Sequence, residues 1–415
     1  MAVIGVLSVT RSTPVRTVIA PGPGRELPSV RDSLFAETME LYTGTHLSRG
    51  NKIEILLNGD ETYPRLWHDL SQAHESITVQ MYYAVPGAVT DSMVAHLTER
   101  ARAHVPVALL LDAFGAAELK RSHVLDTLRA AGVQVAWLRP LRWYTLSRAA
   151  TRSHARVVVI DGRVGYTGGF GLADYWLGDG LHHGQWRETN ARFEGPAVAA
   201  LQAAFVAGWA EATGKLLTGH VVFPHTAFAS AGPMLAGLMH TMPSVGSTPA
   251  ERFLALSIAS ARKTLYITNS YFVPDADFRN MLLDAAKRGV DVRILTVSKN
   301  TDVKTTWLAG RNYYEELLRG GVHIYEYQPV MMHAKTLVVD GQWLSVGSMN
   351  FDNRSMAFNN ETNLVALDTT AGAVMDRIFL NDLAHSEQIS LPGFAHRGWP
   401  EKLEEWGAEK LWRVL

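Results

Sequence analysis

The chain of 415 residues contains no cysteine, which excludes a thiol nucleophile, disulfide bonds and thiolate metal sites. It also lacks an excess of charge, because 39 lysines and arginines stand against 40 aspartates and glutamates. No overall positive potential is available to recruit nucleic acid, so such a partner is not expected. No apolar run approaches the roughly 18 residues of a membrane span. The apolar stretch from Met1 to Thr10 has no basic residue before it, so a secretory signal is not predicted and a cytoplasmic location is favoured.

The strongest positive feature is one motif that occurs twice. It consists of a His, a cation two residues later, four apolar residues and an Asp-Gly pair: His154, Arg156 and Asp161 in the first copy, His333, Lys335 and Asp340 in the second. On a strand, side chains two residues apart leave the same face. The apolar residues predict that this strand continues into a core, and the Asp-Gly pair predicts a turn at its end.

Similarity between the two halves extends beyond the motifs. Residues 83–86 match residues 271–274 as Tyr-x-Val-Pro, and Glu188-Thr-Asn matches Glu361-Thr-Asn. Alternating strands and helices in both halves predict an α/β unit used twice, packed with pseudo-twofold symmetry so that the motifs meet in one site. The expected parts are an N-terminal arm (1–50), a first half (51–223), a second half (224–390) and a C-terminal amphipathic tail (391–415).

On these motifs the chain resembles the phospholipase D superfamily, whose hallmark is a doubled His-x-Lys-x4-Asp sequence. The stretch from Met332 to Ser355 and the run Asn269-Ser-Tyr-Phe-Val-Pro274 are similar to the cardiolipin synthase branch. The resemblance covers roughly residues 50 to 390. It implies a duplicated phospholipase D-type α/β/α sandwich with one shared active site, and a phosphatidyltransferase that needs neither a metal nor another cofactor.

The resemblance also implies roles for individual residues. Attack on an anionic diester needs a nucleophile, cationic stabilisation and an acid for the leaving alcohol. By the family's usual order, His154 is the nucleophile that forms a covalent phospho-histidine, and His333 is the acid and then the base. The sequence alone does not separate these two roles. The other residues expected in the catalytic set are Arg156, Lys335, Asp161, Asp340, Glu188 and Glu361.

Within that set, Glu188 and Glu361 are each expected to orient the His of the opposite half. Asp161 and Asp340 leave two alternatives open, contact with substrate or a structural role at the strand-to-turn junction. The expected ligands of the nonbridging phosphate oxygens are Arg156, Lys335, Ser348 and Asn350.

Two positions depart from the family pattern. Arg156 stands where Lys is usual, and Gly171 stands where Asn is frequent. Arg keeps the charge and grips phosphate with two donors, but it does not replace Lys without consequence. A slower enzyme, or one with a different leaving group, is compatible with these departures. Loss of activity is not expected, because both His, both Asp and both Glu residues are kept.

An insert before the first motif distinguishes the halves, since residues 141–153 correspond to only residues 330–332 in the second half. Interleaved aromatic and basic side chains favour contact with an anionic membrane surface. The alternatives are stacking on nucleic-acid bases or a loop packed by its own aromatic residues. The residues expected at the membrane are Arg139, Arg142, Trp143, Tyr144 and Arg148.

The tail predicts an amphipathic helix, because Trp399, Leu403 and Trp406, and then Leu411, Trp412 and Leu415, recur at helical spacing. Docking of this stripe on the protein's own core is favoured over membrane contact.

The leading function is the synthesis of cardiolipin from two molecules of phosphatidylglycerol, with release of glycerol. The alternatives are a hydrolytic phospholipase D or phosphodiesterase, more distantly a nuclease, and a catalytically weak lipid-binding protein. The expected partners are a glycerophospholipid substrate and an anionic membrane, reached peripherally from the cytoplasmic side. A monomer suffices because both motifs lie in one chain.

Overall fold

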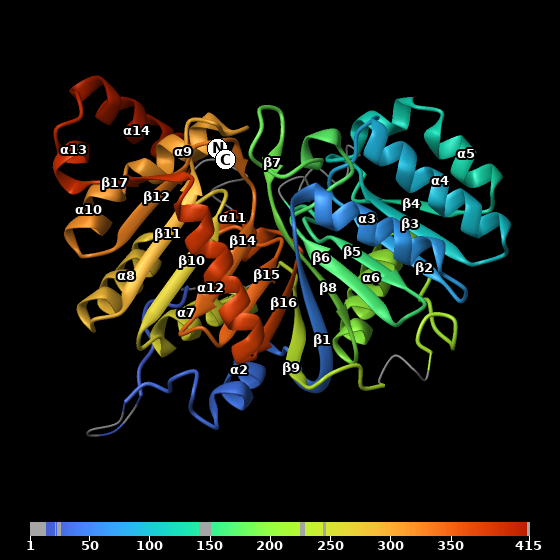
Figure 1. Cartoon of the computed structure of the whole chain (residues 1–415), viewed down its shortest axis with the longest axis horizontal. Coiled ribbons are helices and arrows are strands. Elements are labelled where there is room, and N and C mark those ends of the chain that lie inside the picture. The colour runs from blue at the N-terminus through green and yellow to red at the C-terminus, as the bar shows by residue number, and fades with distance from the viewer. Residues whose placement is uncertain are drawn as a thin grey trace.

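The computed structural model describes residues 14–20, 22, 26–140, 151–224, 229–243 and 246–412. Its centre is a sheet of 15 strands with helices on both faces (Figure 1). Within the described ranges, no helix combines the length and the apolar character needed to cross a bilayer.

The elements of the first half follow one another along residues 35–213. They are α2 (Phe35–Thr43), β1 (Ser48–Leu57), α3 (Asn58–Ser71), β2 (Ile77–Met81), α4 (Ala88–Arg102), β3 (Val107–Asp112), η1 (Ala117–Arg121), α5 (Val124–Ala130), β4 (Gln134–Leu138), β5 (Val157–Ile160), β6 (Val164–Gly168), η3 (Asp174–Trp176), β7 (Trp186–Arg187), β8 (Thr189–Glu194) and α6 (Ala197–Thr213).

The second half and the tail occupy residues 234–412. Their elements are β9 (Met234–Thr241), α7 (Pro249–Ser260), β10 (Thr264–Asn269), α8 (Ala276–Lys287), β11 (Asp291–Val297), α9 (Lys304–Arg311), α10 (Tyr314–Arg319), β12 (His323–Tyr327), β13 (Met331–Met332), β14 (Lys335–Val339), β15 (Trp343–Gly347), α11 (Asn353–Phe358), β16 (Glu361–Leu367), α12 (Thr369–Leu383), β17 (Ser386–Ile389), α13 (Leu391–Ala395) and α14 (Trp399–Trp412).

The sheet has the same strand order in both halves. The first half runs β4-β3-β2-β5-β6-β8-β1, and the second runs β12-β11-β10-β14-β15-β16-β9, with β17 added at its outer edge. The halves join where β1 pairs antiparallel with β9. The predicted duplicated α/β fold is thereby confirmed. One boundary differs, because β1 begins at Ser48, inside the range expected to be an N-terminal arm.

Burial on both faces explains why the central strands are mostly apolar. β2 and β3 are parallel neighbours whose residues are all buried, as are those of β5 and β14. Helices α3, α4 and α5 cover one face of the first half, and α7, α8 and α10 cover one face of the second. A third core, shared by both halves, forms between the sheet, α6 and α12. This shared core fixes the two halves against each other.

An Asp directly follows each motif strand and binds backbone N–H groups at the start of the neighbouring strand. The carboxylate of Asp161 accepts hydrogen bonds of 2.7–3.0 Å from the backbone N–H groups of residues 74–76, just before β2. The carboxylate of Asp340 accepts bonds of 2.7–3.2 Å from residues 262–264, at the start of β10. Both lie at the end of the strand opposite the His. These contacts give Asp161 and Asp340 the structural role at the strand-to-turn junction, and a catalytic role for them stays a prediction.

Helix α14 is attached through its acidic side. The carboxylate of Glu405, only 1% exposed, receives the Nε groups of Arg311 and Arg397 at 3.2 and 2.9 Å. The expected docking of the apolar stripe on the core is therefore wrong, because these ion pairs place the acidic side of the helix against the protein and the apolar stripe toward the outside. The tryptophan stripe, as we call the outward residues at helical spacing, consists of Trp399, Leu403 and Trp406, which are 76%, 55% and 54% exposed.

Replacing Asp340 with Ala tests the structural role of this residue. The change leaves three backbone N–H groups without their acceptor, and we expect the free energy of unfolding to fall by about 2 kcal/mol. Urea denaturation measures this loss, with Asp340→Asn, which keeps one acceptor oxygen, as the milder control. Turnover per folded molecule should not change. A variant of full stability with lost turnover would support the catalytic interpretation.

Candidate active site

The two halves meet through short backbone pairings at the motif histidines. Ser153, directly before the first His, forms a parallel bridge with Asn360 of the second half. Met332, directly before the second His, pairs with Arg187 of the first half through β13 and β7. In each case the next residue is a motif His on one side and a Glu on the other. This register places each His beside the Glu of the opposite half.

Hydrogen bonds join these side chains crosswise. Nδ1 of His154 lies 3.0 Å from Oε2 of Glu361, and Nδ1 of His333 lies 2.5 Å from Oε2 of Glu188. Both Glu residues are fully buried. The predicted contact of each Glu with the His of the other half is confirmed. Since Nδ1 is engaged in both rings, Nε2 is the nitrogen left for attack or proton transfer.

Two buried cations, Arg156 and Lys335, complete the site. Each is 1% exposed and donates to the backbone carbonyl of its own motif His. The guanidinium of Arg156 also donates to the carbonyl of Phe170 at 3.3 Å and faces the ring of Tyr82 at 5.6 Å. Each cation lowers the pKa of the His in the opposite half as well as in its own. The two motifs therefore form one electrostatic unit.

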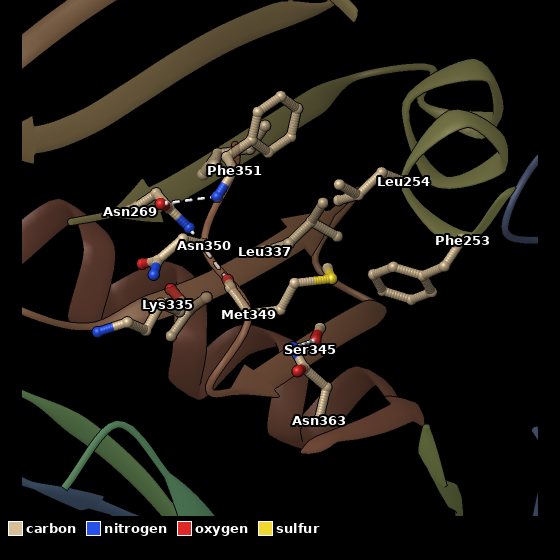
Figure 2. A pocket seen from close by; sticks show the side chains of 12 residues that line it. Phe253, Leu254, Asn269, Lys335, Leu337, Ser345, Met349, Asn350, Phe351 and Asn363 are labelled. Carbon is tan, nitrogen blue, oxygen red and sulfur yellow. Dashed lines mark hydrogen bonds between the residues drawn. The ribbon is translucent and has the colours of Figure 1, made fainter. Parts of the chain in front are cut away.

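Ser348 and Asn350 differ in their availability to a phosphate. The hydroxyl of Ser348 donates its single proton to Oε2 of Glu361 at 2.5 Å. This hydrogen bond helps to position Glu361, and a phosphate contact of Ser348 stays a prediction. Asn350 is 5% exposed, its Oδ1 has no partner among the described residues, and its Nδ2 is the atom that can donate to a phosphate oxygen. Figure 2 shows the amide of Asn350 and the ammonium of Lys335 pointing to the same side, so Asn350 remains a proposed phosphate ligand.

A small cavity of about 20 Å³ lies beneath these two side chains. Its far wall is apolar and includes Phe253 and Leu254, which lie on the side away from the Lys335 ammonium (Figure 2). That volume has room for about one water molecule. The cavity is therefore a packing gap beneath the site and not a lipid channel.

Burial sets the protonation of the site. Desolvation, assisted by the charge of Arg156, lowers the pKa of His154 to about 4, and desolvation holds the pKa of His333 well below its ordinary value. Burial raises the pKa of Glu188 to about 7 and lowers the pKa of Lys335 to about 7. At neutral pH both imidazoles are therefore uncharged. His154 is ready to attack without prior loss of a proton.

Known proteins share this sequence pattern over most of the chain. The family described as "Cardiolipin synthase, PLD-like domain" matches residues 66–178 and 254–383, one segment around each motif His. The cardiolipin synthase of Geobacillus kaustophilus (strain HTA426) is 34% identical over 365 residues, covering 87% of this chain and 72% of the relative. The chain belongs to this cardiolipin synthase family. Cardiolipin synthase A of Pectobacterium atrosepticum is also similar, at 31% identity over 91% of this chain and 78% of its own length.

The same fold occurs in a solved structure whose sequence has little similarity to this chain. The crystal structure of phosphatidylserine synthase from Haemophilus influenzae Rd KW20 superposes with a TM-score of 0.69 at 12% identity. The match covers 91% of this chain and 99% of the other. It establishes a common fold over the whole duplicated unit.

Trp176 explains why this cardiolipin synthase family member has Gly171 where the pattern has Asn. A Cβ atom on Gly171 would lie 2.6 Å from the indole ring of Trp176, so no side chain fits there. The indole Nε1 donates to Oε2 of Glu188 at 3.3 Å, and the ring packs against His333 with centroids 5.4 Å apart. Trp176 therefore supports the Glu188–His333 pair. The sequence analysis missed it, although the departure at Gly171 was a signal that another group fills that space.

The first half also differs from the second at the position that matches Ser348. Gly169 stands there, and a Cβ atom on it would lie 2.3 Å from Oε2 of Glu188. The donor to the carboxylate is thus a serine hydroxyl for Glu361 and an indole N–H for Glu188. The two His–Glu pairs join the same atoms, but their carboxylates receive different donors.

The predicted membrane contact of Arg139 is wrong. Its side chain is 10% exposed and binds Oε1 of Glu211 at 2.8 Å and Oδ1 of Asn360 at 3.0 Å, which joins the two halves. The other residues expected at the membrane lie outside the described residues, namely Arg142, Trp143, Tyr144 and Arg148.

Trp176→Phe tests the support of the Glu188–His333 pair. Phe keeps an aromatic ring above Gly171 but removes the donor to Glu188, so we expect kcat to fall by roughly 10-fold, as for loss of a hydrogen bond to a charged group. Steady-state kinetics measure the effect. Trp209→Phe is the matched control, because Trp209 is also buried but its Nε1 has no partner among the described residues. Equal effects of the two variants would contradict a positioning role.

The pH dependence of kcat/KM tests the two shifted groups. With a soluble diester whose leaving group needs no acid, activity should decline on the acid side around pH 4, as His154 gains a proton. It should decline on the alkaline side around pH 7, as Lys335 loses its charge. Lys335→Arg should move the alkaline decline to higher pH, because a guanidinium keeps its charge. An acid decline at about 6.5, the ordinary imidazole value, would contradict a desolvated nucleophile.

Proposed function

We propose that the protein transfers the phosphatidyl group of one phosphatidylglycerol to the hydroxyl of a second, forming cardiolipin and releasing glycerol. The crosswise pairing of two histidines with two carboxylates, beside two buried cations, is the observation that carries the proposal. One imidazole serves as nucleophile and the other transfers protons, and no water molecule is needed in either step.

In the first step, Nε2 of His154 attacks phosphorus. The bond between phosphorus and the headgroup glycerol oxygen breaks, and the protonated form of His333 gives its proton to that oxygen. The negative charge of the bound diester supports this form, because a nearby anion raises the pKa of an imidazole. The products are free glycerol and a phosphatidyl group bound to His154.

In the second step, His333 takes the proton from the hydroxyl of a second phosphatidylglycerol. The resulting oxygen attacks phosphorus as the bond to His154 breaks, which yields cardiolipin and regenerates the enzyme. We assign Lys335, Arg156 and Asn350 to the nonbridging oxygens of both transition states. Their charges and dipoles are fixed before the substrate arrives, which is the arrangement that stabilises developing charge most effectively.

The surroundings of the histidines support transfer to an alcohol over hydrolysis. The side chains of His154 and His333 are only 11% and 6% exposed. The ring of Tyr82 packs against His154 at 4.9 Å, and the rings of Trp176 and Trp186 pack against His333 at 5.4 and 4.9 Å. Aromatic walls restrict the access of water to the covalent intermediate. We further propose that the reaction takes place at the cytoplasmic face of the membrane, with the protein attached peripherally.

Product analysis tests this function. Purified protein mixed with phosphatidylglycerol in detergent micelles should give cardiolipin and glycerol in equal amounts, measured by mass spectrometry. His154→Ala and His333→Ala should each reduce turnover by on the order of 10⁴-fold or more, and the double variant should lose no more than either alone, because the two residues act as one unit.

Two outcomes would contradict the proposal. Phosphatidic acid as the only lipid product, even at high lipid density, would indicate a hydrolase. Full activity in either His variant would exclude the two-histidine mechanism. A covalent adduct trapped on His333 in place of His154 would exchange the two roles and keep the reaction.

A further inference from the structure

Helix α14 exposes its apolar side, which a helix at a protein surface normally buries against the core. Its inward side carries Glu405 and Glu409, both 1% exposed, and Ala408 between them. The carboxylate of Glu409 accepts a hydrogen bond of 2.7 Å from the hydroxyl of Tyr313. The ion pairs of Glu405 with two arginines fix the same orientation. The outward orientation of the apolar side is therefore held by specific contacts.

The outward side combines aromatic and basic residues. Trp399, Leu403 and Trp406 recur at spacings of four and three residues, so they lie on one side of the helix. By the same spacing the exposed Lys402 and Lys410 lie beside them; Lys410 Nζ lies 3.0 Å from Oε2 of Glu409, and Lys402 donates to the carbonyl of Ala395 at 3.2 Å. The exposed Glu401 and Glu404 fall outside this stripe by helical spacing. Tryptophan with adjoining lysine is the composition of helices that lie in a membrane interface, where indole enters the headgroup region and the ammonium meets anionic phosphate.

The position of α14 relates this surface to the active site. α14 packs on α9, which follows the loop that leads out of β11 (Figure 1). In that loop the carboxylate of Asp302 accepts a hydrogen bond of 2.7 Å from Tyr271, and its charge acts on Lys335. In Figure 1, α14 and α9 lie on the same edge of the molecule as β7, which directly precedes Glu188. A bilayer that touches α14 would therefore lie on the active-site side.

We propose that the tryptophan stripe of α14, with Lys402 and Lys410, binds the surface of an anionic lipid bilayer and holds the active site next to it. This inference rests on the proposed function, in which the substrate is a membrane lipid. Lysine supplies the attraction to anionic headgroups, and the tryptophans supply the part that enters the interface.

Vesicle flotation of the full chain tests the proposal. The wild-type protein should bind vesicles of phosphatidylglycerol more strongly than vesicles of phosphatidylcholine, and salt should weaken this binding by screening the lysines. A Trp399→Ser/Trp406→Ser variant should bind at least about 10-fold less, because it removes the residues that enter the interface. Leu41→Ser/Leu216→Ser is the matched control, since these residues are 83% and 73% exposed elsewhere and should not contribute. A Lys402→Gln/Lys410→Gln variant should lose most of the salt dependence.

Activity in detergent micelles separates this proposal from the proposed function. The tryptophan variant should turn over dispersed phosphatidylglycerol at the wild-type rate and lose activity only on vesicles. Absence of cardiolipin formation by the wild type in micelles would count against the function, while the flotation result would still decide the role of the stripe.

Three results would overturn the proposal. The first is wild-type protein that does not bind anionic vesicles. The second is tryptophan variants that bind as well as the wild type, which would assign the contact to another part of the chain. The third is a change from dimer to monomer in the tryptophan variant, seen by light scattering, with vesicle binding unchanged. That result would identify the stripe as a contact between two copies of the chain.

Discussion

The crosswise hydrogen bonds between the motif histidines and the carboxylates of the opposite half are the contact on which the site depends. Neither half contains a complete pair, because His154 is hydrogen-bonded to Glu361 and His333 to Glu188. Three other contacts between the halves keep each His next to its Glu. They are the backbone pairings just before these residues, the shared core under α6 and α12, and the pairing of β1 with β9. A small shift between the halves would separate both pairs at once.

Burial of so many ionisable groups in one place has an electrostatic cost that substrate binding offsets. Two cations, two carboxylates and two imidazoles lie out of water, and burial moves the pKa values of His154, Glu188 and Lys335 toward the uncharged forms. A bound diester adds a negative charge to the site, and this charge favours the protonated forms of Lys335 and His333. The site is thus more stable with its ligand than without it, which is common where residues are arranged for catalysis and not for stability.

The sequence predicted the parts of the structure that spacing encodes. Duplication and the α/β class followed from motifs that occur twice, and the pairing of Glu188 and Glu361 with the His of the opposite half was implied by the family resemblance. Other features depend on contacts between distant residues. The single proton of Ser348 goes to Glu361, which the motif alone does not show. In α14, helical spacing identified which residues share a face, but the inward face was decided by Arg311, 94 residues before Glu405.

The two halves have diverged at two glycine positions of the first half. Gly169 and Gly171 leave room for Glu188 and for the indole of Trp176, whereas the matching positions of the second half carry side chains that the site uses. Two copies of the first half, paired as a homodimer, would support both carboxylates through an indole, and two copies of the second half would support both through a serine. Each half thus carries the donor for its own carboxylate, while the His that this carboxylate orients comes from the other half. The support of a carboxylate can therefore change in one half without a matching change in the other.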